Sequence, residues 1–211
     1  MIITYHGLEF FRVQFGDTIL AFNPISKNSK YKSAHFGADI ALVTLADKDF
    51  NGIESVTHGE KTPFVVSGPG EYEIKEVFIK GTPSISNYGE KKLNTIYTVS
   101  LENMNICFLG ALGSTEVSSE VIESLGEIDI LFIPIGGEGV LKAGEAYKFA
   151  VTLEPKIIIP MQYGEVGDKN ALKIFLKEGG EENLKPIDKL TVKKKDLEGK
   201  EGDIVVLESA S

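Results

Sequence analysis

Two aspartates two positions apart, Asp47 and Asp49, are candidates for metal chemistry. They follow the apolar run 40–44, which lacks a helical period and predicts a short buried strand. Carboxylate oxygens at a strand end could bind one hard cation such as Mg²⁺ or Mn²⁺, but such a cation takes more oxygen ligands than two aspartates provide. The alternative is a solvated loop, or a cap for a helix over residues 50–56. The pair therefore indicates at most a weak divalent-cation site.

The other residues that could do chemistry stand alone. His6 lies in the first predicted strand and could line a pocket at its end, although a single strand histidine is usually a hydrogen-bonded structural residue. Gln162 and Tyr163 could orient a substrate or stabilise an oxyanion, but no suitable base accompanies them to activate water without a metal. Cys107 lies in an apolar run without a neighbouring histidine, which indicates a core residue. These residues predict no catalytic group.

The elements that must position these residues change character along the chain. Residues 1–20 have short apolar runs separated by turn residues such as Gly16 and Asp17, which predicts consecutive antiparallel strands, and the rest of the first half is dominated by predicted β structure. The second half alternates between helical and strand-like spacing. Helices are predicted over 116–125, 143–153 and 168–177, and strands over 128–133, 156–159, 190–192 and 204–207. Because each sheet must bury an apolar face, this order indicates layered sheets covered by helices, which a four-layer αββα sandwich satisfies.

The composition predicts an acidic, soluble chain. Its 211 residues, 42% of them hydrophobic, can bury the core of a single domain over residues 1–211. A net charge of -9 disfavours nucleic acid as a partner. One cysteine allows neither an intrachain disulfide nor a thiolate zinc cluster, which favours the reducing cytoplasm. The apolar runs are far shorter than the roughly 20 residues that cross a bilayer, and the N-terminus lacks the pattern of a secretory signal, so we expect no membrane partner.

Seven segments, in order along the chain, resemble the small prokaryotic branch of the metallo-β-lactamase superfamily whose members are called metal-dependent hydrolases. They are residues 3–11, 20–24, 38–50, 67–73, 107–113, 129–137 and 155–163. The resemblance covers most of the chain and implies the four-layer αββα fold. In that family, His and Asp side chains from loops at strand ends hold metal ions that activate water.

The sequence departs from that family at nearly every metal-binding position. The positions that correspond to the family's ligands, here called the family ligand positions, are occupied by Leu45, Asp47, Asp49, Phe50, Ser86, Ala111 and Gln162. Only Asp49 matches the family residue, and the supporting aspartate of the family corresponds to Asn23. Leu, Phe and Ala offer a metal no lone pair, and a Gln amide is a poor zinc ligand. The resemblance therefore implies a cleft lined by these positions, with no bound zinc and no catalytic residue.

Three hypotheses for the function remain open. The first is a protein that has lost the zinc ligands and serves as a binding, regulatory or assembly module for a small molecule or a protein. The second is a hydrolase with a reorganised site that uses Asp47, Asp49, Gln162 and Tyr163. The third is a homo-oligomer in which the cleft is packed shut and an outer surface carries the function. We favour them in this order, because so many apolar replacements fit poorly with metal chemistry.

Overall fold

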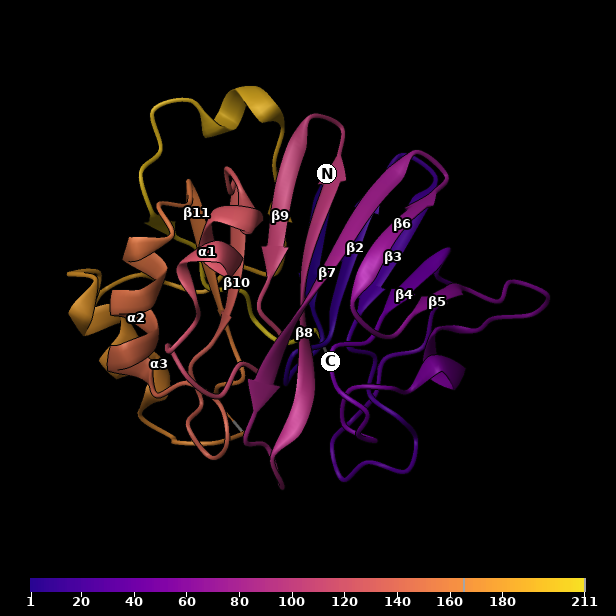
Figure 1. Ribbon diagram of the computed structural model, residues 1–211, viewed down its shortest axis with the longest axis horizontal. Helices are drawn as coiled ribbons and strands as arrows, with labels where there is room; N and C mark the ends of the chain where they lie inside the picture. Colours follow the sequence, from indigo (N-terminus) through magenta and orange to yellow (C-terminus); the bar gives the residue numbers. More distant parts are fainter. Residues whose placement is uncertain (165, 211) are drawn as a thin grey trace.

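Two mixed β-sheets form the centre of the computed structural model, which describes residues 1–164 and 166–210 (Figure 1). The first sheet has six strands in the order β12-β1-β2-β3-β4-β5. They are β1 (Ile2–Tyr5), β2 (Phe11–Phe15), β3 (Thr18–Phe22), β4 (Ile40–Leu42), β5 (Phe64–Val66) and β12 (Leu190–Thr191). Gly16 has a φ of 51°, a conformation that glycine adopts without strain, and forms the predicted turn between β2 and β3.

The second sheet has seven strands in the order β13-β11-β10-β9-β8-β7-β6. They are β6 (Gly70–Ile74), β7 (Val77–Ser86), β8 (Lys92–Leu101), β9 (Met104–Phe108), β10 (Ile130–Pro134), β11 (Ile157–Met161) and β13 (Asp203–Ile204). Strands β9, β10, β11 and β13 run parallel, whereas β6 to β9 form antiparallel hairpins. Antiparallel hairpins and the β-α alternation of the second half of the chain thus meet in this sheet, whereas in the six-stranded sheet β4 pairs in parallel with β3 and β5.

Aromatic side chains from both sheets fill the space between them. The ring centroids of Phe11 and Phe132 lie 4.7 Å apart, and those of Phe22 and Phe108 lie 4.8 Å apart. All four side chains are fully buried. Each pair joins a strand of the first sheet to a strand of the second, so these contacts fix how the sheets stack.

The two outer faces are covered differently. Within the described residues, three α-helices pack on the outer face of the seven-stranded sheet: α1 (Ser119–Leu125), α2 (Ala143–Thr152) and α3 (Ala171–Glu178). The outer face of the six-stranded sheet is covered by residues 23–37 and by η1 (Ile53–Val56), a short 3-10 helix, whereas η2 (Lys194–Leu197) lies near the C-terminus. Ala21 and Ala41 leave room there for Ile25 and Val56 to pack closely.

The ends of several strands meet at one edge of the stacked sheets. The backbone N–H of Gln162, just after β11, donates to the carbonyl of Leu8, just after β1, at 2.7 Å. Just after β9, a Cβ at Gly110 would lie only 2.5 Å from Oγ1 of Thr44, which follows β4. Loops from both sheets therefore lie against one another at this edge, where the family ligand positions are found.

The predicted fold class is confirmed, with the predicted helices and late strands displaced by a few residues at their ends. The predicted cap is wrong: residues 50–56 contain only the short η1, whose N-cap residue is Gly52 rather than Asp47 or Asp49. Among the described residues, no helix has both the length and the apolar character needed to cross a membrane.

Candidate functional site

Three of the family ligand positions are filled by apolar side chains that pack together. Leu45, Phe50 and Ala111 lie at the strand-end edge, and no more than 1% of any of them is exposed. They belong to one hydrophobic cluster with Leu8 and Val166. These side chains were expected to line a cleft, and in the structure they pack into the space between the strand ends. Such a cluster offers no metal ligand.

The carboxylate of Asp47 forms an ion pair with a lysine of β8. Its Oδ2 lies 2.7 Å from Nζ of Lys92, and its Oδ1 accepts the backbone N–H of Asp49 at 3.1 Å. Partial burial raises the pKa of Asp47, but the hydrogen bond and positive charge of Lys92 outweigh burial and hold the pKa below its ordinary value. Asp47 therefore braces the loop after β4 against β8.

Asp49, the one family ligand position with the family residue, is held by two hydroxyl groups. Ser29 Oγ donates to Oδ1 at 2.5 Å, and the Tyr88 hydroxyl donates to Oδ2 at 2.7 Å. Burial and the bond to Asp49 raise the pKa of Tyr88 well above its ordinary value, so Tyr88 stays a donor. The Tyr88 ring also packs edge-on against Phe50. Asp49 thus joins the loop after β3 to the loop after β7.

The last two family ligand positions differ in how well their polar atoms are bonded. Ser86 is buried and its Oγ accepts the backbone N–H of Tyr88 at 3.1 Å. Gln162 is also fully buried, but neither atom of its side-chain amide has a hydrogen-bond partner among the described residues. An unbonded buried amide is unfavourable by about 1–3 kcal/mol, so Gln162 is the least satisfied of the family ligand positions.

A buried polar network that the sequence analysis missed lies beside the apolar cluster. Asn23 donates from Nδ2 to Oε2 of Glu9 and to Oγ1 of Thr44, both at 2.8 Å, and its Oδ1 accepts the backbone N–H of Thr44. Glu9 is fully buried, and burial raises its pKa to about 8 despite the bond from Asn23. The signal in the sequence was an acidic residue in the otherwise apolar run 8–11.

The donors at this edge do not fit the two-zinc centre of the family. Zinc in proteins is bound by imidazole, thiolate and free carboxylate groups. Both aspartates are engaged by other side chains, and the described residues include no group of three or more His, Cys, Asp and Glu that could hold a metal ion. His6 and His35 border a cavity that none of the family ligand positions lines, and His58 pairs with Lys61 in an isolated bridge. The described side chains at this edge therefore do not form a metal site of the family's kind.

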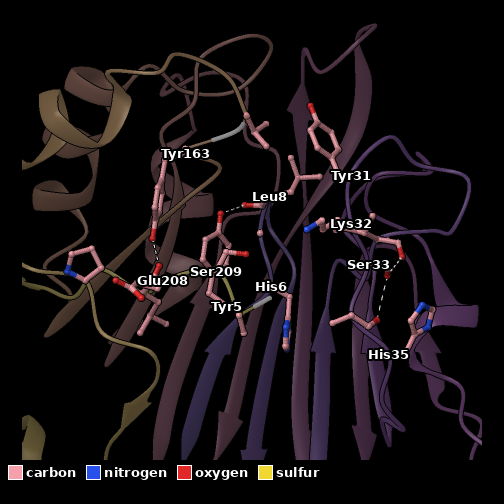
Figure 2. A pocket seen from close by; sticks show the side chains of 18 residues that line it. Tyr5, His6, Leu8, Tyr31, Lys32, Ser33, His35, Tyr163, Glu208 and Ser209 are labelled. Carbon is pink, nitrogen blue, oxygen red and sulfur yellow. Dashed lines mark hydrogen bonds between the residues drawn. The ribbon is translucent and has the colours of Figure 1, made fainter.

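A cavity of about 670 Å³ lies next to the apolar cluster, and none of the seven family ligand positions lines it (Figure 2). Figure 2 shows Tyr31 and Lys32 on one side, Tyr163 on the other, and His6 between them. His6 borders this cavity, and neither of its ring nitrogens has a hydrogen-bond partner among the described residues. The Ala210 backbone lies close enough to act against the larger lowering of the His6 pKa by burial, so a structural role for His6 stays a prediction beside its position at the cavity. Leu45 borders a smaller cavity of about 380 Å³ beside β5 and β8.

Two stacked mixed sheets with loops from both sheets meeting at one edge are the architecture of the metallo-β-lactamase fold. Residues 2–162 match the family described as the beta-lactamase superfamily domain, and the chain belongs to this superfamily. A Thermotoga maritima structure assigned to the Zn-dependent hydrolases of the metallo-β-lactamase superfamily aligns over 98% of this chain and 97% of its own, with a TM-score of 0.77 and 25% identity.

Relatives of known sequence match the chain over part of their length. A UPF0173 protein from Pyrococcus abyssi is 34% identical over 143 residues, which are 65% of this chain and 65% of that protein. A UPF0173 metal-dependent hydrolase from Listeria welshimeri is 28% identical over 150 residues, 70% of this chain and 61% of its own. The match therefore spans less than two thirds of these relatives.

Proposed function

We propose that this chain is a non-catalytic member of the superfamily that works as a binding module. One observation carries the proposal: the family ligand positions hold apolar side chains in a buried cluster, aspartates already paired with other residues, or the buried polar side chains of Ser86 and Gln162. Both carboxylate oxygens of Asp49 accept hydrogen bonds from hydroxyl groups, and Asp47 forms an ion pair with Lys92. To bind a metal, each aspartate would have to break these contacts and leave its former partner unpaired.

A hydrolase with a reorganised site is less well supported by the same contacts. Asp49 is buried and bonded through both oxygens, so it is poorly placed to take a proton from water. The Tyr163 hydroxyl donates to the Leu207 carbonyl, and the Gln162 amide is fully buried. Neither group is free to orient a substrate. The name metal-dependent hydrolase belongs to the relatives, whose ligand residues need not be those of this chain.

Binding is the role left for the strand-end edge, because the cavity beside the cluster remains open. Its walls come from segments far apart in the sequence, namely β1, the loop after β3, the loop after β11 and the C-terminal segment. Ligand sites of proteins are commonly concave, mostly apolar and furnished with a few polar groups. A small molecule or a segment of a partner protein is the class of occupant that we propose.

Metal content tests the non-catalytic assignment. The protein is purified without chelator, incubated with zinc, desalted and analysed for metal by mass spectrometry. We expect far less than one metal ion per chain, and the same result for Asp49→Asn. Two zinc ions per chain that persist through desalting and disappear in Asp49→Asn would overturn the proposal. Hydrolase turnover that is lost in Asp49→Asn but kept in the exposed control Asp188→Asn would overturn it as well.

A further inference from the structure

The 670 Å³ cavity has walls of different chemical character. One wall is the segment 31–35, which follows the loop pinned by Asp49 through Ser29. The opposite wall is formed by Tyr163 and the segment 207–210, which is fixed to β1 by a hydrogen bond from the Ala210 N–H to the Tyr5 carbonyl at 2.8 Å. Both walls are therefore anchored by hydrogen bonds within the protein.

Apolar surface dominates the inside of the cavity. The side chains of Leu8, Ile25, Val166 and Leu207 line it and are themselves largely buried. Tyr5 is also fully buried, and its hydroxyl donates to the Leu8 carbonyl at 2.9 Å, so it presents its ring rather than a free donor. A ligand that fills this space must therefore carry an apolar body.

Positive charge is placed on the segment 31–35. Figure 2 shows the ammonium group of Lys32 extending from this wall towards Leu8. Lys32 forms no ion pair with a carboxylate of the described residues, whereas Lys61, Lys75 and Lys92 each do. The acidic side chain among the described lining residues, Glu208, belongs to the opposite wall, on the side of Tyr163 in Figure 2. An anionic group would thus be drawn to the Lys32 side.

The neutral polar groups of the cavity fit the same kind of ligand. Burial lowers the pKa of His6 to about 4, so its imidazole is neutral at physiological pH and offers one donor and one acceptor. Ser209 adds a hydroxyl on the opposite wall. These groups can bond to uncharged polar atoms on the body of a ligand, and they leave Lys32 as the partner for its charge.

We propose that this cavity binds a small amphipathic organic anion, with its apolar body among Leu8, Ile25 and Leu207 and its anionic group beside Lys32. The inference rests on the proposed function, because it assigns the binding role to this cavity rather than to the family ligand positions. The shared chemistry is an apolar or aromatic body bearing one carboxylate or sulfonate. A hydrolytic step is not part of the proposal.

Two fluorescent probes of the same shape test the inference. Anilinonaphthalenesulfonate carries the anionic group, and phenylnaphthylamine has the same aromatic body without charge. We expect the sulfonate to bind at one site per chain, and Lys32→Gln to weaken it by about fivefold, as expected for an ion pair near the surface. Lys32→Gln should leave the uncharged probe unaffected. Lys27→Gln, on the same loop but outside the cavity, is the matched control and should change neither affinity.

A second variant locates the site independently of charge. Ser209 is exposed and lines the cavity, so Ser209→Trp should fill the space, leave the fold intact by circular dichroism and weaken both probes at least tenfold. Unchanged binding in Ser209→Trp, or equal losses in Lys32→Gln and Lys27→Gln, would overturn the inference. Metal content measured on the same samples separates the two proposals. Zinc-free protein that fails these tests refutes the anion site alone, and zinc-loaded protein that passes them refutes the non-catalytic assignment alone.

Discussion

Glu9 provides the strongest test of how this strand-end edge is held together. Its carboxyl group is fully buried, accepts one bond from Asn23 and has no partner for Oε1 among the described residues. Burial raises its pKa from 4.5 to about 8, so the folded protein keeps the proton over a pH range in which the unfolded chain has released it. Glu9→Gln removes the titration and preserves the size of the side chain.

The sign and size of the effect follow from proton linkage. Between pH 4.5 and about 8 the native state binds one more proton than the unfolded state, so the free energy of unfolding falls as pH rises. Each pH unit changes it by about 1.36 kcal/mol. The full window therefore corresponds to a loss on the order of 5 kcal/mol, of which about 4 kcal/mol falls between pH 5 and pH 8. This contribution is present at low pH and is lost above the native pKa.

Urea denaturation of the wild type and Glu9→Gln at pH 5, 6.5 and 8 measures this directly. We expect similar stabilities at pH 5, and a growing advantage of Glu9→Gln that reaches about 4 kcal/mol at pH 8. Glu116→Gln, at an exposed position, should follow the wild type at each pH. A difference between Glu9→Gln and the wild type that stays constant from pH 5 to pH 8 would refute the reasoning, because Glu9 would then titrate alike in both states.

Three further predictions concern neighbouring groups. The pKa of His6 is lowered to about 4, so the free energy of unfolding should fall by about 3 kcal/mol as pH falls from 6.5 to 4. In urea denaturation, His6→Gln should remove this dependence on pH. An NMR titration midpoint of His6 near 6.5 would contradict the prediction. Asp49→Asn and Tyr88→Phe should each lower the free energy of unfolding by about 1–3 kcal/mol, and the double variant should lose less than the sum of the two losses. Strict additivity would show that the hydrogen bond between Tyr88 and Asp49 is not formed. Gln162→Met replaces an unbonded amide by an apolar side chain of similar length, and its thermal midpoint should stay level or rise; a clear drop would mean that the amide is bonded in solution.

The order of elements could be predicted from the sequence because its signals are local. The turn at Gly16 and the strand predicted from the apolar run 40–44 each depend only on residues close in the sequence. The structure has the turn and the strand where they were expected. The partners of the polar side chains depend on tertiary structure. Asp49 is bonded to Ser29 and Tyr88, which are 20 and 39 positions away. No periodicity carries such information. The sequence therefore suggested a cation site, a solvated loop or a helix cap, whereas in the structure Asp49 links two loops through hydrogen bonds.

The cavity escaped prediction for a related reason. Its two walls, the segments 31–35 and 207–210, lie at opposite ends of the sequence and meet only because β1 pairs with the C-terminal segment. Lys32 and Ser209 are ordinary surface residues in a linear reading. What the sequence did show was that His6 could line a pocket at the end of its strand, and this part of the interpretation is supported by the structure.

The apolar cluster explains why the family ligand positions differ from the family as a group. Leu45, Phe50 and Ala111 contact one common hydrophobic cluster, so a histidine or aspartate restored at one of them would bury a polar group among apolar side chains. That group would gain no metal, since Asp47 and Asp49 remain bonded to Lys92, Ser29 and Tyr88. Each single reversal is therefore unfavourable while the others are absent. The hydrogen bonds of Asp47 and Asp49 and the packing of the apolar cluster therefore depend on one another. Of this edge, the adjoining cavity is the part that a ligand can enter.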